Sequence, residues 1–105
     1  MSLKSEDRKH YRSIGHHLKP IILIGNAGLS EAVLTEIARA LDDHELIKIK
    51  IAGEDREARA ALIAELVAAT GAELVQSLGR TLLIVRRVAQ PHPRLSNILR
   101  HSGGA

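Results

Sequence analysis

Hydrophobic and polar residues alternate most clearly over residues 46–51, a stretch that reads Leu-Ile-Lys-Ile-Lys-Ile. Side chains of a strand point alternately to its two faces. The three isoleucines therefore fall on one face, and Lys48 and Lys50 fall on the other. This pattern predicts a strand whose isoleucines face a layer of helices and whose lysines face solvent or a ligand.

A helical period of apolar residues occurs on both sides of this strand. Over residues 31–42 the apolar positions are spaced by three and four residues, as on one face of a helix: Leu34, Ile37, Ala38 and Leu41. A second such helix is expected between Asp55, a good N-cap, and Gly71, a residue typical of a helix end. Residues 5–15 are polar, and they predict a helix on the surface of the domain.

Further strands are expected at residues 21–24, 74–78 and 81–85. The first is a short β-branched run, which favours a strand buried on both faces. Gly79 and Arg80 between the last two strands are typical of a hairpin turn. The order α-β-α-β-α-β-β predicts an α/β fold of α+β-like, two-layer type with a four-stranded mixed sheet. Right-handed crossovers imply parallel pairing among the first three strands.

Composition narrows the class of protein. The 105 residues suit one domain, expected at residues 1–87. Residues 88–105 lack periodicity and predict a flexible basic tail, with room for one short turn near residues 95–99. The chain contains no cysteine, one aromatic residue (Tyr11), no apolar run long enough to span a membrane and no signal-peptide pattern. A soluble, monomeric, cytoplasmic protein is therefore expected. Residues 1–20 carry net charge +3, residues 21–85 carry −4 and residues 86–105 carry +4, which suggests a polyanionic partner.

Between the first strand and the following helix lies a Gly-x-x-Gly turn made of Gly25, Asn26, Ala27 and Gly28, here called the GxxG loop. Ser30 is a good N-cap for the helix that follows, and a helix N-terminus attracts anions such as phosphate. From these residues alone a plain strand-to-helix turn is the favoured interpretation, because short loops with glycine commonly join a strand to a helix. The longer glycine-rich motif with lysine that binds nucleotide phosphates is absent.

Several motifs in one order resemble a known family. They are Leu18-Lys19-Pro20, Gly25-Asn26-Ala27-Gly28-Leu29, His44-Glu45-Leu46-Ile47-Lys48-Ile49-Lys50, Glu54-Asp55-Arg56, Thr70-Gly71-Ala72 and residues 76–81. Over about residues 18–87 the chain resembles the YhbY-like proteins, the stand-alone bacterial form of the CRM domain (chloroplast RNA splicing and ribosome maturation).

The resemblance implies an RNA-binding domain, similar in fold to the C-terminal domain of translation initiation factor three, that acts on precursors of the large ribosomal subunit. It also implies that the GxxG loop contacts RNA. Many family members carry a basic residue in this loop, whereas this chain has Asn26 and Ala27. Backbone N–H groups are then expected to bind phosphate, with charge supplied by neighbouring residues. The candidates are Lys19, Lys48, Lys50, Arg56 and Arg80.

Neither a cofactor, a metal nor catalysis is expected. His10, His16 and His17 are interpreted as exposed residues of a basic segment, since no cysteine or carboxylate pair completes a metal site. The acid pairs at residues 42–43 and 54–55 are explained by helix ends. With one aromatic residue the chain cannot offer a base-stacking sheet, which favours recognition of structured RNA through its backbone. The alternative is a module that docks on a ribosomal protein or an assembly factor.

Overall fold

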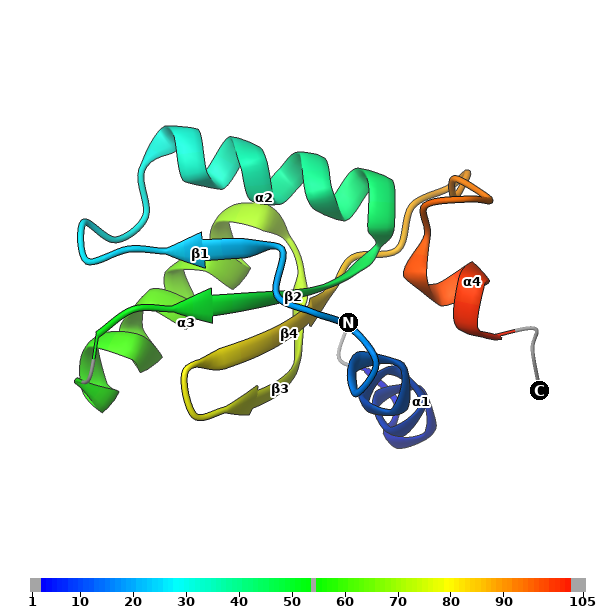
Figure 1. The fold of residues 1–105 in the computed structure, drawn as a ribbon, viewed down its shortest axis with the longest axis horizontal. Coiled ribbons are helices and arrows are strands. Elements are labelled where there is room, and N and C mark those ends of the chain that lie inside the picture. Colours follow the sequence, from blue (N-terminus) through cyan, green and yellow to red (C-terminus); the bar gives the residue numbers. More distant parts are fainter. Residues whose placement is uncertain (1–2, 54, 103–105) are drawn as a thin grey trace.

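The elements of the fold follow the order that the sequence predicts. The computed structural model describes residues 3–53 and 55–102. Its elements are α1 (Ser5–Gly15), β1 (Ile22–Ile24), α2 (Glu31–His44), β2 (Leu46–Ile51), α3 (Arg56–Thr70), β3 (Glu73–Leu78), β4 (Thr81–Val85) and α4 (Asn97–Ser102) (Figure 1). The last helix has no counterpart among the predicted elements.

The four strands form one mixed sheet in the order β1-β2-β4-β3. β1 pairs with β2 in parallel, as predicted. The expected pairing of β2 with β3 is wrong, because β4 lies between them and pairs antiparallel with both. β4 is buried at four of its five positions, whereas β3 is exposed from Gln76 onward, so burial places β4 inside the sheet and β3 at its edge.

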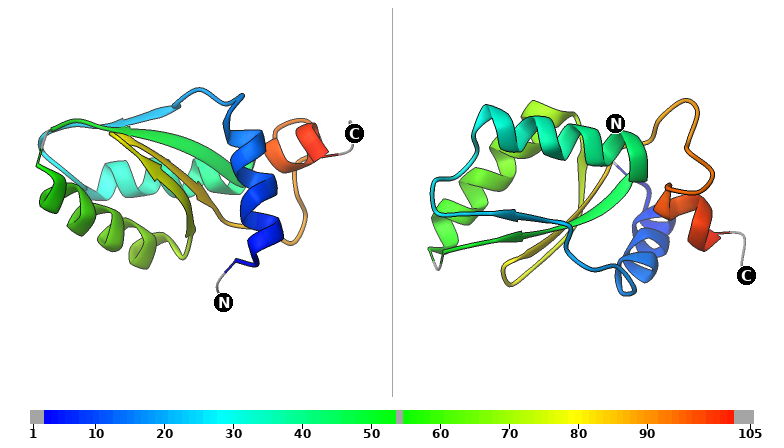
Figure 2. Two further views of the ribbon diagram at one scale, coloured as in Figure 1. Left: turned by 90° about the horizontal axis from the view of Figure 1, so that it is seen from below. Right: turned by 45° about the horizontal axis from the view of Figure 1, so that its top comes forward.

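The main core lies between one face of the sheet and the helices α2 and α3, which Figure 2 shows together on that side. The sheet contributes the three isoleucines of β2, as the alternation predicts, together with Ile22, Ile24, Leu82 and Ile84; the helices contribute Ile37, Leu41 and Leu66. The predicted helix ends are also confirmed. Ser30 Oγ accepts a hydrogen bond from the Val33 N–H at 3.1 Å, and Asp55 Oδ1 accepts one from Glu57 at 2.9 Å.

The opposite face of the sheet is covered at one end only. There α1 and α4 pack on it and form a second cluster of Tyr11, Ile14, Leu46, Val75, Leu83, Val85 and Ile98. Gly15 lets α1 approach closely, since a Cβ at this position would stand 2.5 Å from Leu83 Cδ2. No other element of the described residues covers the rest of this face, here called the open face.

β1 differs from the expected strand with two buried faces. Ile22 and Ile24 are buried, but Leu23 between them is 63% exposed. β1 is an edge strand, and at its position helices cover one face of the sheet and not the other. Leu23 therefore lies on the open face, where Lys50 is its neighbour in β2.

The C-terminal segment (residues 88–102) differs from the expected flexible tail. It returns to the domain and ends in α4, with the side chains of Ser96 and Ile98 buried. Ser96 Oγ donates a hydrogen bond of 2.7 Å to Glu45 Oε1, a carboxylate oxygen that is itself buried. Where this segment leaves β4, the Tyr11 hydroxyl accepts a hydrogen bond from Arg87 and raises the pKa of that guanidinium. Residues 103–105 of the predicted tail lie outside the described residues.

Candidate nucleic-acid interface

The GxxG loop lies at the end of the sheet where β1 and β2 both terminate. Ile24 is opposite Ile51 in the parallel pair, so the residues after the two strands meet there. The Gly28 N–H donates to the Gly25 carbonyl at 3.0 Å, which closes a tight turn, and Gly28 has φ +80°, a conformation that favours glycine. The side chains of Asn26 and Ala27 are exposed at the tip of the turn.

Some of the backbone donors expected to bind phosphate are used within the protein. The Gly28 N–H is bound to Gly25, and the Val33 N–H at the start of α2 is bound to Ser30. A phosphate at this loop would therefore depend more on the charge of neighbouring side chains.

A groove of about 180 Å³ separates the GxxG loop from the connection between β2 and α3. Gly53, which has φ +100°, forms part of its wall close to Asn26. On the far side lies Arg59, whose Nη1 donates to the Gly53 carbonyl at 3.3 Å. Arg59 was not among the predicted site residues, although it stands three positions after Arg56, a spacing that puts both on one helix face. Asp55 also lines the groove, where its carboxylate caps α3.

Arg56 and Arg80 lie at the same end of the sheet as the GxxG loop. Arg56 and Arg59 line a second cavity of about 390 Å³, which α3 forms with Ser77 and Gly79 of the β3–β4 hairpin. The carbonyl of Arg80 accepts a hydrogen bond from the Ile51 N–H at 2.8 Å, so the hairpin turn reaches the end of β2. Arg56, Arg59 and Arg80 thus all lie at the end of the sheet where the loop lies.

The predicted lysines do not all join this group. Lys50 is exposed on the open face near the loop, between Leu23 and Thr81 of the neighbouring strands. Lys48 lies two residues further from the loop, and together with Lys19 it lines a separate cavity. The structure therefore brings together the loop, Lys50, Arg56 and Arg80, and it places Lys19 and Lys48 elsewhere.

Among residues 3–53 and 55–102, no three histidine or acidic side chains stand close enough together to hold a metal ion. Tyr11, the one aromatic residue of the chain, is 4% exposed and packs in the second cluster. Within the described residues, no helix has the length and apolar character needed to cross a membrane.

Comparison with known proteins gives consistent matches over most of the chain. Over 103 residues it is 48% identical to Probable RNA-binding protein PA4753 of Pseudomonas aeruginosa, covering 98% of this chain and 99% of the relative. Over 85 residues it is 41% identical to a Haemophilus influenzae protein named RNA-binding protein, a match that covers 81% of this chain and 86% of the relative.

A solved structure and a family description agree with these relatives. The solution structure of the hypothetical protein SAV1595 from Staphylococcus aureus, described as a candidate RNA-binding protein, has a TM-score of 0.74 at 31% identity. The match covers 84% of this chain and 92% of the Staphylococcus aureus chain. Residues 3–86 match the CRS1 / YhbY (CRM) domain. The chain belongs to the CRS1/YhbY (CRM) domain family.

Proposed function

We propose that this protein is a non-enzymatic RNA-binding protein that engages structured ribosomal RNA during assembly of the large ribosomal subunit. The observation that carries the proposal is the position of Arg59 in the groove of the GxxG loop, with Arg56 in the adjoining cavity, in a chain of the CRM family. Relatives named as RNA-binding proteins support the same class of ligand.

In the proposed mechanism, the exposed tip of the GxxG loop lies against the RNA backbone. Its glycines leave room for a phosphate to approach the main chain. The arginines at this end of the sheet neutralise neighbouring phosphates, and Lys50 extends the positive charge onto the open face. Phosphate contacts of this kind give affinity and position rather than base identity. Because Tyr11 is buried, recognition depends on RNA shape and not on base stacking.

A second candidate is the protein-interaction module, and one observation favours it. Ile21, Leu23 and Leu78 are 51%, 63% and 71% exposed. Leu23 lies on the open face, and exposed aliphatic side chains of this size are a common feature of docking surfaces. A partner that remains bound after ribonuclease treatment of a cell extract, and is lost in the Leu23→Ser variant, would support this function.

The salt dependence of RNA binding tests the proposed function. The wild-type protein is titrated with a structured fragment of large-subunit RNA between about 50 and 300 mM KCl. Neutralisation of about three phosphates predicts a slope of roughly −2 to −3 in a plot of log K against log salt concentration. A slope near zero would exclude binding through phosphate contacts. A matched RNA hairpin from outside the ribosome measures how much of the affinity is specific.

A further inference from the structure

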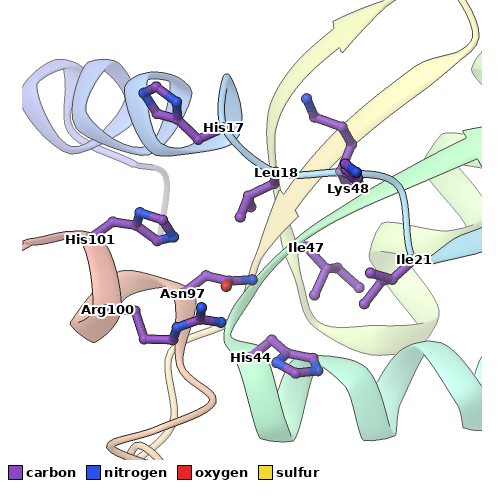
Figure 3. A pocket seen from close by; sticks show the side chains of 10 residues that line it. His17, Leu18, Ile21, His44, Ile47, Lys48, Asn97, Arg100 and His101 are labelled. Carbon is purple, nitrogen blue, oxygen red and sulfur yellow. The ribbon is translucent and has the colours of Figure 1, made fainter.

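The largest of the cavities described here, about 420 Å³, lies at the end of β2 opposite to the GxxG loop. Figure 3 shows its lining side chains, which come from separate parts of the chain: the end of α1, the lead into β1, the end of α2, the start of β2 and α4. Its volume is in the range of small-ligand sites. Residues 88–102 supply one wall, although they follow the segment that matches the family.

This wall is held by three consecutive residues at the junction of α2 and β2. His44 Nδ1 donates to the Leu95 carbonyl at 2.9 Å, since a carbonyl can only accept. The buried carboxylate of Glu45 accepts from Ser96 Oγ at 2.7 Å. Asn97 Nδ2 donates to the Leu46 carbonyl at 2.7 Å, on a part of β2 that β1 does not reach. These three hydrogen bonds therefore fix this wall of the cavity against the rest of the domain.

The lining of this cavity is cationic. Three of its side chains are charged bases, Lys19, Lys48 and Arg100, and three histidines line it as well: His17, His44 and His101. Among the described residues that line it, none is acidic. In Figure 3, Arg100 extends from α4 toward the cavity that it shares with His44.

An apolar surface adjoins these charges. Leu18, Ile21 and Ile47 line the same cavity, so a group that combines an anion with a flat or aliphatic body fits its chemistry better than a bare ion. A nucleotide of an RNA chain has this combination. Its phosphate would meet the cations, and its sugar or base would lie on the aliphatic side chains.

We propose that this cavity, here called the α4 pocket, is a second RNA site that binds one phosphate-bearing nucleotide of the RNA. The inference rests on the proposed function. It assigns Lys19 and Lys48 to the α4 pocket instead of the GxxG loop. About four residues of β2 separate Lys48 from Ala52 beside the loop, roughly 13 Å at the rise of a strand, so one RNA molecule can contact both sites.

A charge-matched pair of variants tests the α4 pocket. Arg100→Gln removes a cation from the pocket, and Arg94→Gln removes one from an exposed turn in the same C-terminal segment that does not line it. Each variant lowers the net charge by one, so a difference in RNA affinity between them reports the position of the lost cation and not the change in net charge. Circular dichroism checks that both remain folded, as expected for exposed residues. The probes are a structured large-subunit RNA fragment and, in a separate titration, inorganic phosphate.

We expect Arg100→Gln to weaken RNA binding about fivefold to twentyfold and to reduce the salt slope by about 0.7 to 0.9, the value for one phosphate contact. Arg94→Gln should stay within about twofold of wild type. Inorganic phosphate should shift the NMR signals of the Asn97 side-chain amide in wild type and less so in Arg100→Gln.

Three results would overturn the inference, and they differ in what they say of the proposed function. Equal RNA binding by the two variants removes the α4 pocket from the RNA site and leaves the proposed function intact. A phosphate response at Asn97 without any effect of Arg100→Gln on RNA binding assigns the pocket to a free anion. Wild-type protein that binds no RNA refutes the proposed function together with this inference.

Discussion

Replacing Glu45 with alanine tests whether the C-terminal segment is part of the folded domain. The Glu45 side chain is fully buried, with Oε1 accepting from Ser96 Oγ at 2.7 Å and Oε2 accepting from the Val88 N–H at 2.8 Å. Arg87 Nε lies 3.5 Å from the same carboxylate. Glu45 also has φ +61°. Alanine is strained at this φ as glutamate is, so the Glu45→Ala variant isolates the contribution of the side chain.

The magnitude follows from the two donors that lose their acceptor. A buried donor without a partner costs about 1–3 kcal/mol. The Ser96 hydroxyl is fully buried, whereas Val88 is half-buried and water can replace part of its bond. Removing the carboxylate also relieves the cost of burying its charge, which offsets part of the loss. We expect Glu45→Ala to lower the free energy of unfolding by about 2–4 kcal/mol, out of a typical total of about 5–15 kcal/mol.

Urea unfolding followed by circular dichroism measures this loss. Glu36→Ala, an exposed position on α2, is the matched control and should change stability by less than about 0.5 kcal/mol. A double-mutant cycle of Glu45→Ala with Ser96→Ala should give a coupling energy above about 1 kcal/mol. A loss below about 1 kcal/mol for Glu45→Ala, or a cycle without coupling, would refute the argument that this carboxylate holds the C-terminal segment.

Two further predictions concern the packing of the sheet. Gly15→Ala places a methyl group against the buried Leu83 side chain, so we expect a loss of about 1–3 kcal/mol in urea unfolding, and unchanged stability would show that α1 adjusts freely. Ile24→Ala should cost about 2–5 kcal/mol because its side chain is fully buried. Its exposed neighbour should tolerate Leu23→Ala within about 0.5 kcal/mol, and similar losses in the two variants would contradict the assignment of buried and open faces.

Local patterns in the sequence predict most of the elements. The period of two in β2 assigns its isoleucines to the core and its lysines to the other face, and both assignments are confirmed. Helix ends are also predictable, because Ser30, Asp55 and Gly71 act through atoms of their immediate neighbours. In each case the cause lies within a few residues of the effect.

Features that depend on distant contacts are not predictable in this way. The position of β4 between β2 and β3 depends on which strand buries both faces, and the β3–β4 hairpin alone is compatible with either order. The bond between Glu45 and Ser96 spans 51 residues of sequence. No local pattern predicts this bond, because the segment around Pro91 and Pro93 lacks periodicity. The C-terminal segment is held by single residues and not by a repeated pattern.

The candidate site shows the same division. Arg56 is predictable because it opens α3 beside the GxxG loop, and Arg59 could have been found from its spacing on the same helix face. The separation of Lys19 and Lys48 from the loop, in contrast, is not predictable from local spacing. These two lysines line a cavity whose other wall is α4, a helix that was not predicted.

A binding experiment on the GxxG loop tests the central claim most directly. Gly25→Asp is the appropriate variant, because a Cβ at Gly25 meets no atom within 4 Å and Gly25 lacks the positive φ of Gly28. The new carboxylate would repel RNA phosphate without straining the fold. Ala68→Asp, on an exposed position of α3, carries the same change of charge away from the loop. We predict about tenfold weaker binding of structured large-subunit RNA for Gly25→Asp than for Ala68→Asp; equal affinities in the two folded variants would contradict the account.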